Sequence, residues 1–539
     1  MEQKTLLIGD VDAIQEFVFE TSSLPQIRGG SQLLLECEDE VAKKVEDLGG
    51  EKIHCSGGSF LFEIPSNQVE TAREAIEKIY LDHTLTATVT VAFESGVLPP
   101  DLPSPPQNGW ANRLWAAHQQ AQQSGDFARQ VAFLGAQIRQ RKSQKTDTPF
   151  LETFPFGKRC ERCGKRLAIG HEPVEGGKAL CAVCWRRDQK GRSKEQEIRG
   201  KFNQEFWTLF AAREGFRARQ SQDLDTLVRG AKRTQLAFLY ADGNDIGGLL
   251  QQAASKDEYS QISEAVREGT KEALFQAVVT VCGSTLRKEN TCWPFDIINV
   301  GGDDVTVLIQ PGYAWELAVE FLKNFEAEIN RRLPGRVRRA GPVTASAGIV
   351  VADVKHPVRY LAHLAGDLLK RAKKVAKADS NHPQSAVTFL WLPNPIATEK
   401  AEPLMAYYKR NDNEILTARP YTLDRAEQLT GLVEQASQWP RSLRYRWGEA
   451  LEHGMWVSLN TVYYDIARKK KGERARLAHF LSQVSNLAVQ QQYQASPPGP
   501  LWQSYQEGKQ TGWRTALLDV LELAELRAMR SDVREEEER

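Results

Sequence analysis

One order of sequence features occurs twice in this chain, and this repeat restricts the folds that the chain can adopt. In each copy an apolar run leads into a short acidic segment, first Asp10–Ile14 and later Asp242–Ile246. A glycine pair then opens a second apolar run, first at Gly57-Gly-Ser-Phe60 and later at Gly301-Gly-Asp-Asp304. Apolar runs of this length, alternating with helical patterns, predict a duplicated α+β domain.

The two copies differ at the glycine turn. The second copy has Asp303 and Asp304 where the first, matched glycine to glycine, has Ser59 and Phe60. We therefore expect one chemically competent copy and one degenerate copy.

Length and charge set the context for this repeat. With 539 residues the chain exceeds the ~250–300 residues at which single cores stop growing, so we expect several domains. The 70 basic and 70 acidic side chains balance, so any nucleic-acid surface must be local. No apolar run reaches the ~18 residues of a membrane span, and the start lacks signal-peptide character. We expect a cytoplasmic protein with no membrane partner.

The acids of the second copy predict a metal site. Two apolar runs flanking Gly301-Gly-Asp-Asp304 predict a hairpin with Asp303 and Asp304 at its tip. Asp242 ends another predicted strand, and neighbouring strands lie ~4.8 Å apart, so the three carboxylates can converge. Clustered carboxylates repel unless a cation neutralises them, and such oxygen ligands favour Mg²⁺ or Mn²⁺. The implied reaction is nucleotidyl transfer.

Two features near these acids have a plainer interpretation. An isolated Gly-Gly-Asp-Asp sequence is most often an ordinary polar turn, but here an acidic strand end precedes it and a strand and a basic helix follow it. In that helix Lys373 is either a solvated lysine or a contact to a triphosphate. No Gly-Lys-Ser or Gly-Lys-Thr occurs in the chain, which excludes a Walker A phosphate loop.

Four cysteines form a separate module. Cys160 and Cys163 are separated by two residues, as are Cys181 and Cys184, with 17 residues between the pairs. This spacing predicts a four-thiolate zinc site, which has no open coordination position and is therefore structural. Two redox pairs are the alternative, but no thioredoxin-like context surrounds them.

The same part of the chain is basic. Between Lys158 and Lys201 there are 13 Lys or Arg and 6 Asp or Glu residues. This excess is either a surface that faces a polyanion or a solvated basic face of a small module.

Taken in order, these motifs resemble one family, the large subunit of type III CRISPR effector complexes (the Cas-ten family). The resemblance covers nearly the whole chain. It depends on the four cysteines and on four motifs: Asp10-Val-Asp-Ala-Ile-Gln-Glu-Phe17, Arg28-Gly-Gly-Ser-Gln-Leu-Leu34, Tyr240-Ala-Asp-Gly-Asn-Asp-Ile-Gly247 and Gly301-Gly-Asp-Asp304.

The resemblance implies an α+β multidomain fold with two ferredoxin-like or GGDEF-like palm domains, a four-cysteine zinc module and a C-terminal all-helical domain. The expected boundaries are a degenerate first palm at 1–100, a helical connector at 101–155, the zinc module at 156–190, a helical linker at 191–232, the catalytic second palm at 233–398 and the C-terminal domain at 399–539.

The family also implies roles for residues of the second palm. Asp242, Asp303 and Asp304 resemble the catalytic metal ligands for Mg²⁺ or Mn²⁺. The implied nucleotide-binding residues are Gly243, Asn244, Asp245, Gly301, Gly302, Ser346 and Lys373. The implied activity is synthesis of cyclic oligoadenylates from ATP when guide CRISPR RNA pairs with a target RNA. Implied partners are the guide 5′-end-binding subunit, the small helical subunit and the backbone subunits.

The sequence departs from the family pattern in two places. Many members begin with a nuclease domain marked by His-Asp, whereas this chain starts almost at the first palm strand and none of its nine histidines precedes an aspartate. We therefore expect no single-stranded DNase activity. The family often has Asp-Gly-Asp-Asn where this chain has Asp-Gly-Asn-Asp at 242–245, so the position of the second ligand stays open.

Two other functions remain as alternatives. A stand-alone GGDEF-like cyclase acting on GTP would share the glycine-turn site, but the duplication and the zinc module disfavour it. A catalytically silent scaffold would retain the same partners without consuming ATP.

Overall fold

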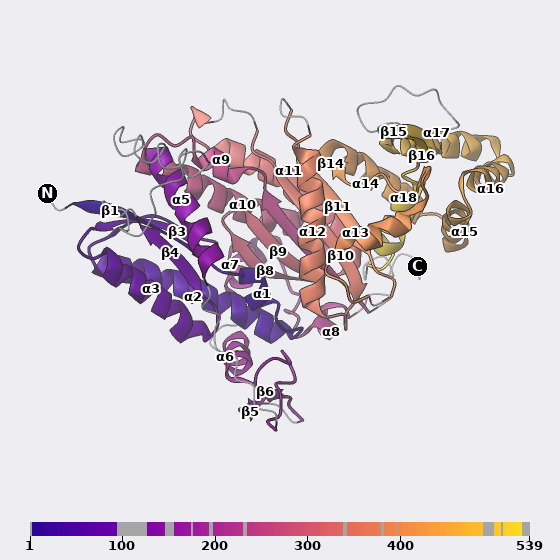
Figure 1. Cartoon of the computed structure of the whole chain (residues 1–539). Coiled ribbons are helices and arrows are strands. Elements are labelled where there is room, and N and C mark those ends of the chain that lie inside the picture. Colours follow the sequence, from indigo (N-terminus) through magenta and orange to yellow (C-terminus); the bar gives the residue numbers. More distant parts are fainter. Residues whose placement is uncertain are drawn as a thin grey trace.

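Two repeated α/β units lie side by side, with the cysteine module projecting from them and a mainly helical C-terminal region at one end (Figure 1). The computed structural model describes residues 3–93, 127–145, 156–173, 176–192, 198–229, 234–337, 342–378, 382–394, 396–488, 501–507 and 510–530.

The first unit has the ferredoxin-like order of elements. Its antiparallel sheet has the strand order β2-β3-β1-β4, and α2 buries an apolar stripe that includes Ile27, Leu34 and Val41 against the unit's core. The elements are β1 (Lys4–Val11), α1 (Ile14–Val18), α2 (Leu24–Asp47), β2 (Glu51–Ser56), β3 (Ser59–Pro65), α3 (Val69–Thr84) and β4 (Val89–Phe93).

The second unit repeats this topology and extends it. Its sheet has the order β14-β11-β10-β7-β9-β8, in which β8-β9-β7-β10 corresponds to β2-β3-β1-β4 of the first unit. This shared order supports the predicted duplication. The elements are β7 (Gln235–Gly243), α9 (Ile246–Leu250), α10 (Lys256–Leu286), β8 (Phe295–Gly301), β9 (Asp304–Ile309), α11 (Pro311–Arg332), β10 (Ala345–Asp353), α12 (Val358–Ala376) and β11 (Ala386–Trp391).

The correspondence holds residue by residue where the first strand of each unit ends. Ala13 and Asp245 each precede a short helix in a left-handed conformation, with φ of 50° and 59°. Asp10 lies opposite Thr90 on the neighbouring strand, and Asp242 lies opposite Ser346 in the same way.

The glycine turns correspond with a shift of one residue relative to the match made from the sequence. Ser56 pairs with Ser59 in the first unit, and Gly301 pairs with Asp304 in the second. Ser59 is therefore the structural counterpart of Asp304, and Gly58 is the counterpart of Asp303. Matching the glycines to one another was wrong because strand pairing, and not residue type, sets the register.

Between the two units the described part of the chain is mostly helical, apart from the hairpin of the cysteine module. The expected connector at 101–155 contains α5 (Phe127–Gln144), while 101–126 and 146–155 lie outside the described residues. The elements that follow are β5 (Gly170–His171), β6 (Ala179–Leu180), α6 (Ala182–Gly191), α7 (Lys201–Glu214) and α8 (Leu224–Leu227).

The C-terminal region is helical in its main mass, but it also carries short strands that the all-helical expectation missed. These strands are only two to five residues long, too short for a clear alternation of apolar and polar residues, and β13 pairs with β16 across about a hundred residues of sequence. The elements are α13 (Ala401–Met405), η2 (Ala406–Tyr408), β12 (Lys409–Asn411), β13 (Glu414–Ile415), β14 (Tyr421–Thr422), α14 (Leu423–Ser437), α15 (Arg441–Glu452), α16 (Met455–Ala467), α17 (Lys471–Ala488), β15 (Gln503–Glu507), β16 (Gln510–Arg514) and α18 (Leu517–Arg527).

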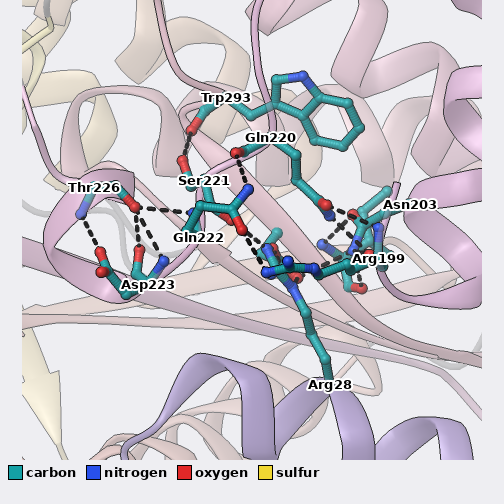
Figure 2. A network of polar contacts seen from close by, with 11 residues as sticks. Arg28, Arg199, Asn203, Gln220, Ser221, Gln222, Asp223, Thr226 and Trp293 are labelled. Carbon is teal, nitrogen blue, oxygen red and sulfur yellow. Dashed lines mark hydrogen bonds and ion pairs between the residues drawn. The ribbon is translucent and has the colours of Figure 1, made fainter. Parts of the chain in front are cut away.

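A buried polar network joins the two units. Arg28 on α2 forms an ion pair with Asp296 on the edge strand β8, and its Nη2 donates to the Ser221 carbonyl at 2.7 Å. Asn203 on α7 donates to Asp296 at 3.1 Å, and Figure 2 shows Arg28 and Asn203 converging on this point. The network covers the open edge of the second sheet with elements of the first unit and the linker.

Within the described residues, no helix is long and apolar enough to cross a bilayer.

Candidate active site and metal centre

The three predicted acids converge at one end of the second sheet. Asp242 lies near the end of β7, Asp303 lies in the turn between β8 and β9, and Asp304 begins β9. A carboxylate oxygen of Asp303 lies 2.9 Å from the place that a Cβ at Gly243 would occupy. Gly243 therefore leaves the space that this approach of the two acids requires.

The electrostatics of this cluster indicate uncompensated negative charge. Burial, followed by the charge of Asp242, raises the pKa of Asp303 well above its ordinary value. The same two causes raise the pKa of Asp304 to about 8, although Asn299 donates a hydrogen bond to it at 3.1 Å. Three oxygen ligands that repel one another in this way fit a hard divalent cation such as Mg²⁺ or Mn²⁺.

Lys373 reaches the same cluster from α12. Its Nζ forms an ion pair with Asp242 and donates to the Gly243 carbonyl oxygen at 2.8 Å. Its side chain is about three-quarters covered, so the interpretation as a solvated lysine is wrong. Lys373 therefore places one positive charge beside the three carboxylates.

Of the other residues predicted near the acids, Ser346 and Asn244 form hydrogen bonds that fix the backbone, whereas Asp245 lies on the surface. Ser346 is fully buried and donates its hydroxyl to Asn244 at 2.9 Å, while the Asn244 amide donates to the Thr344 hydroxyl at 3.0 Å. These bonds tie the end of β7 to β10. Asp245 is exposed and precedes α9, and among the described residues it forms no hydrogen bond or ion pair with the three acids. The structure thus brings together Asp242, Asp303 and Asp304, but not Asp245.

The glycine turns of the two units touch each other. A Cβ at Gly57 would lie 2.7 Å from the carbonyl carbon of Gly301, and Gly302 has a positive φ of 65°. Glu38 on α2 accepts a hydrogen bond from the Gly58 amide at 2.5 Å. Sequence reasoning missed Glu38, because in the acidic run from Glu36 to Glu40 nothing distinguishes it from a solvated helical face.

The acids of the first unit are neutralised by lysines. Lys142 lies 2.6 Å from Asp10 and 3.2 Å from Asp12, and Lys145 lies 2.8 Å from Asp12. Burial works to raise the pKa of Asp12, but the hydrogen bond and charge of Lys145 hold it below its ordinary value. This is the opposite of the second unit, where the acids carry excess negative charge.

The four cysteines form a closed cluster. All four are buried, and their sulfur atoms lie within 4.8 Å of one another. Cys163 Sγ and Cys181 Sγ are 3.8 Å apart, which matches the ~3.8 Å edge of a tetrahedron built from Zn–S bonds of ~2.3 Å. The donor set therefore fits zinc, with no position left for a substrate.

The cysteine module is fixed to the first unit. A Cβ at Gly29 would lie 1.9 Å from the Arg187 carbonyl oxygen, and one at Gly191 would lie 1.7 Å from that of Pro25, so α2 and α6 meet backbone to backbone. Arg166 adds a two-pronged bond to Glu20 at 2.9 and 3.0 Å. The close approach of α2 and α6 explains Gly29 in the segment 28–34, whereas a Cβ at Gly30 would make only ordinary contacts.

Comparison with protein families identifies the second unit. Residues 235–381 match the model of the Cas10/Cmr2 second palm domain. The chain contains a Cas10-type palm. The family resemblance predicted from the motifs is confirmed for this domain.

Solved structures extend the likeness of fold. A crystal structure of a Csm1-Csm4 cassette in complex with cA4 aligns with 98% of this chain and 70% of that chain, at 14% identity and a TM-score of 0.53. A cassette in complex with pppApA gives the same values. At this identity the comparison shows a shared fold. No match was found among curated proteins.

Proposed function

We propose that this chain is the large subunit of a type III CRISPR RNA-guided effector complex and that its Cas10-type palm makes cyclic oligoadenylates from ATP when target RNA is bound. The observation that carries the proposal is the convergence of Asp242, Asp303 and Asp304 with raised pKa values at Asp303 and Asp304. The Cas10/Cmr2 family match and the shared fold with Csm1-Csm4 cassettes that hold cA4 or pppApA support it.

The proposed chemistry assigns a role to each group. Asp242, Asp303 and Asp304 hold divalent ions, which when bound lower the pKa of an attacking ribose hydroxyl and support the departing pyrophosphate. Gly243, Gly301 and Gly302 allow close approach of the nucleotide backbone. Lys373 exchanges its bond to Asp242 for the phosphates of ATP.

Three further residues keep or lose a nucleotide role. Ser346 and Asn244 act as supports that fix the end of β7. Asp245, on the exposed N-terminal side of α9, keeps only a peripheral nucleotide contact.

The first palm takes part without metal. Lys142 and Lys145 already neutralise Asp10 and Asp12, so we assign this palm to holding the second palm's turn in place. Structural zinc at the four cysteines, guide and target RNA, and the other effector subunits complete the proposed assembly, which we place in the cytoplasm.

The test is product formation by the assembled complex. Incubation with ATP, Mg²⁺ and complementary RNA should yield cyclic oligoadenylates detectable by mass spectrometry, and Asp303→Ala with Asp304→Ala should abolish them. Asp10→Asn, the matched acid of the first palm, should retain them. Equal yields from wild type and the Asp303/Asp304 variant would refute the assignment. Turnover of GTP without RNA would favour a stand-alone cyclase. RNA binding without any ATP consumption would favour a scaffold.

A further inference from the structure

A cleft of about 620 Å³ lies where four parts of the chain meet, away from the acids. Its walls come from the start of α2, the cysteine module, the linker around α8 and the segment after β10. Val354 in its wall follows the far end of β10, whereas Ser346 near the other end lies opposite Asp242. Asp353 lies seven positions beyond Ser346 along β10, a span of roughly 23 Å.

Five cationic side chains line this cleft, which we call the basic cleft: Arg162, Lys178, Arg192, Arg199 and Lys355. Four of them belong to the basic segment that the sequence singled out.

The carboxylates of the basic cleft do not match these charges. Of its three acids, Glu172 forms an ion pair with Arg162, and Asp223 accepts the Thr226 amide at 2.7 Å as the cap of α8. Among the described residues, neither Lys178 nor Lys355 forms an ion pair, and both are exposed. Asp223 and the third acid, Asp225, offset part of the lysine charge, but five cations against three acids leave the lining of the cleft net positive.

Arg199 lies where positive charge gathers. It donates to the neutral amide oxygen of Gln222, as Figure 2 shows, and within the described ranges it forms no ion pair. Burial, followed by the charges of Arg28 and Arg192, lowers its pKa from the ordinary value. An anion in the cleft would relieve this repulsion.

The N-terminus of α2 adds to the same field. This helix is 24 residues long, and Leu24 and Pro25 of its first turn line the cleft. The side chain of its N-cap residue, Ser23, makes no capping hydrogen bond. The positive end of the helix dipole therefore faces the cleft together with the five cations.

We propose that the basic cleft binds the phosphate of a nucleotide-sized ligand without a divalent metal, the phosphate belonging either to a free nucleotide or to the end of an RNA strand. The volume lies within the ~300–1,000 Å³ of small-molecule sites, and Lys and Arg are the side chains that bind phosphate. Because the cleft has cations where the palm site has acids, it needs no metal to attract phosphate. This proposal goes beyond the cyclase activity and does not depend on it.

The test measures binding to the full-length chain by titration calorimetry, at low salt and with no Mg²⁺ or Mn²⁺ added, so that the acid site holds no divalent ion while the cysteine module keeps its zinc. The probes are AMP, pyrophosphate and a 5′-phosphorylated RNA hexanucleotide. We expect one site per chain, and at least roughly tenfold weaker binding in Lys178→Glu with Lys355→Glu because two positive charges of the cleft become negative.

The matched control is Lys43→Glu with Lys409→Glu, which makes the same change of charge at two exposed lysines elsewhere and should retain binding. Asp303→Ala with Asp304→Ala should also retain it, which separates this site from the palm. If the charge reversals fail to fold, Lys178→Gln with Lys355→Gln replaces them.

The probes distinguish the source of the phosphate. Equal affinity for AMP and the hexanucleotide identifies a free nucleotide, and tighter binding of the hexanucleotide identifies a strand end; either supports the proposal. Absence of binding by every probe to the wild type, or equal weakening in the cleft and control variants, overturns it.

Discussion

Glu38 places a carboxylate at the contact between the two palms. It lies on α2 of the first palm and accepts the Gly58 amide, while its charge contributes to the raised pKa of Asp304 in the second palm. Burial raises the pKa of Glu38 from 4.5 to about 7, although the Gly58 hydrogen bond works against this. At neutral pH the palm interface thus contains an acid that ionises with difficulty.

Replacing Glu38 by glutamine should change the pH dependence of stability. The unfolded chain releases the proton near pH 4.5 and the folded chain only near 7, so wild-type stability falls across this window, by at most about 3 kcal/mol. Glu38→Gln keeps an acceptor for the Gly58 amide and removes this loss. The Tm of the variant minus the Tm of wild type should therefore be larger at pH 8.5 than at pH 5.

Thermal unfolding at pH 5 and at pH 8.5, with no Mg²⁺ or Mn²⁺ added, measures this difference in Tm. Glu46→Gln, on an exposed turn of the same helix, should show no such trend. A Tm difference for Glu38→Gln that is the same at pH 5 and 8.5 would mean that Glu38 is ionised throughout.

At the scale of single residues, sequence could predict the acids but not their surroundings. Asp242, Asp303 and Asp304 follow from apolar runs and turn residues that lie close in sequence. Glu38 and Lys142 could not be found in this way, because their partners are 20 and 132 residues away and their own local patterns are those of ordinary surface helices.

At the scale of elements, the contact between the two glycine turns should be sensitive to one methyl group. Gly57 and Gly176 have similar positive φ, 66° and 68°, so alanine at either position carries the same backbone cost of roughly 1–2 kcal/mol. Only at Gly57 does the new Cβ meet another palm, 2.7 Å from the Gly301 carbonyl carbon, since a Cβ at Gly176 meets nothing within 4 Å.

We therefore expect Gly57→Ala to weaken Mn²⁺ binding at the acids, measured by calorimetry, and Gly176→Ala to leave it unchanged. Equal Mn²⁺ affinity in both variants would show that the first palm's turn does not position the second.

The cysteine module should depend on its metal. The four buried sulfur atoms lie within 4.8 Å of one another. Without a bound cation, no interaction offsets the repulsion between their thiolates, so loss of the metal should destabilise the module. Elemental analysis of natively purified protein should give one zinc per chain, and chelation should make the segment 158–192 the first site of limited proteolysis. A metal-free preparation with an unchanged cleavage pattern would contradict this prediction.

Element prediction from the sequence succeeded for the apolar strands of the two palms and failed for the short strands of the C-terminal region. Both palms contain hairpins whose apolar runs are separated by a glycine turn, and these were predicted. The strand pairs β13–β16 and β11–β14 join segments that are distant in the chain and only two residues long on one side, so neither alternation nor turn residues indicate them.

At the scale of the whole molecule, the duplicated palms are held together by a buried ion pair. Arg28 and Asp296 have side chains that are 1% and 0% exposed, and they join α2 of one palm to the edge strand of the other. Asn203 donates to Asp296 and the Ser221 carbonyl accepts from Arg28, whereas Nη1 of Arg28 is buried with no hydrogen-bond partner among the described residues. Burying both charges costs desolvation free energy, so the net contribution of the pair to stability is small. Removing only one partner costs much more, because the other charge then stays buried without a counter-charge.

Arg28→Met should therefore destabilise the chain by roughly 3–5 kcal/mol, because Asp296 remains buried without its cation. Arg28→Met with Asp296→Asn should recover much of this loss, since the amide keeps part of the hydrogen bonding to Asn203 and carries no charge. Lys4→Ala, which removes an exposed ion pair with Glu63, should cost less than about 1 kcal/mol. Urea unfolding followed by tryptophan fluorescence measures the stability of all three variants. If the double variant is no more stable than Arg28→Met, the shape of the Arg28 side chain, and not its charge, joins the palms.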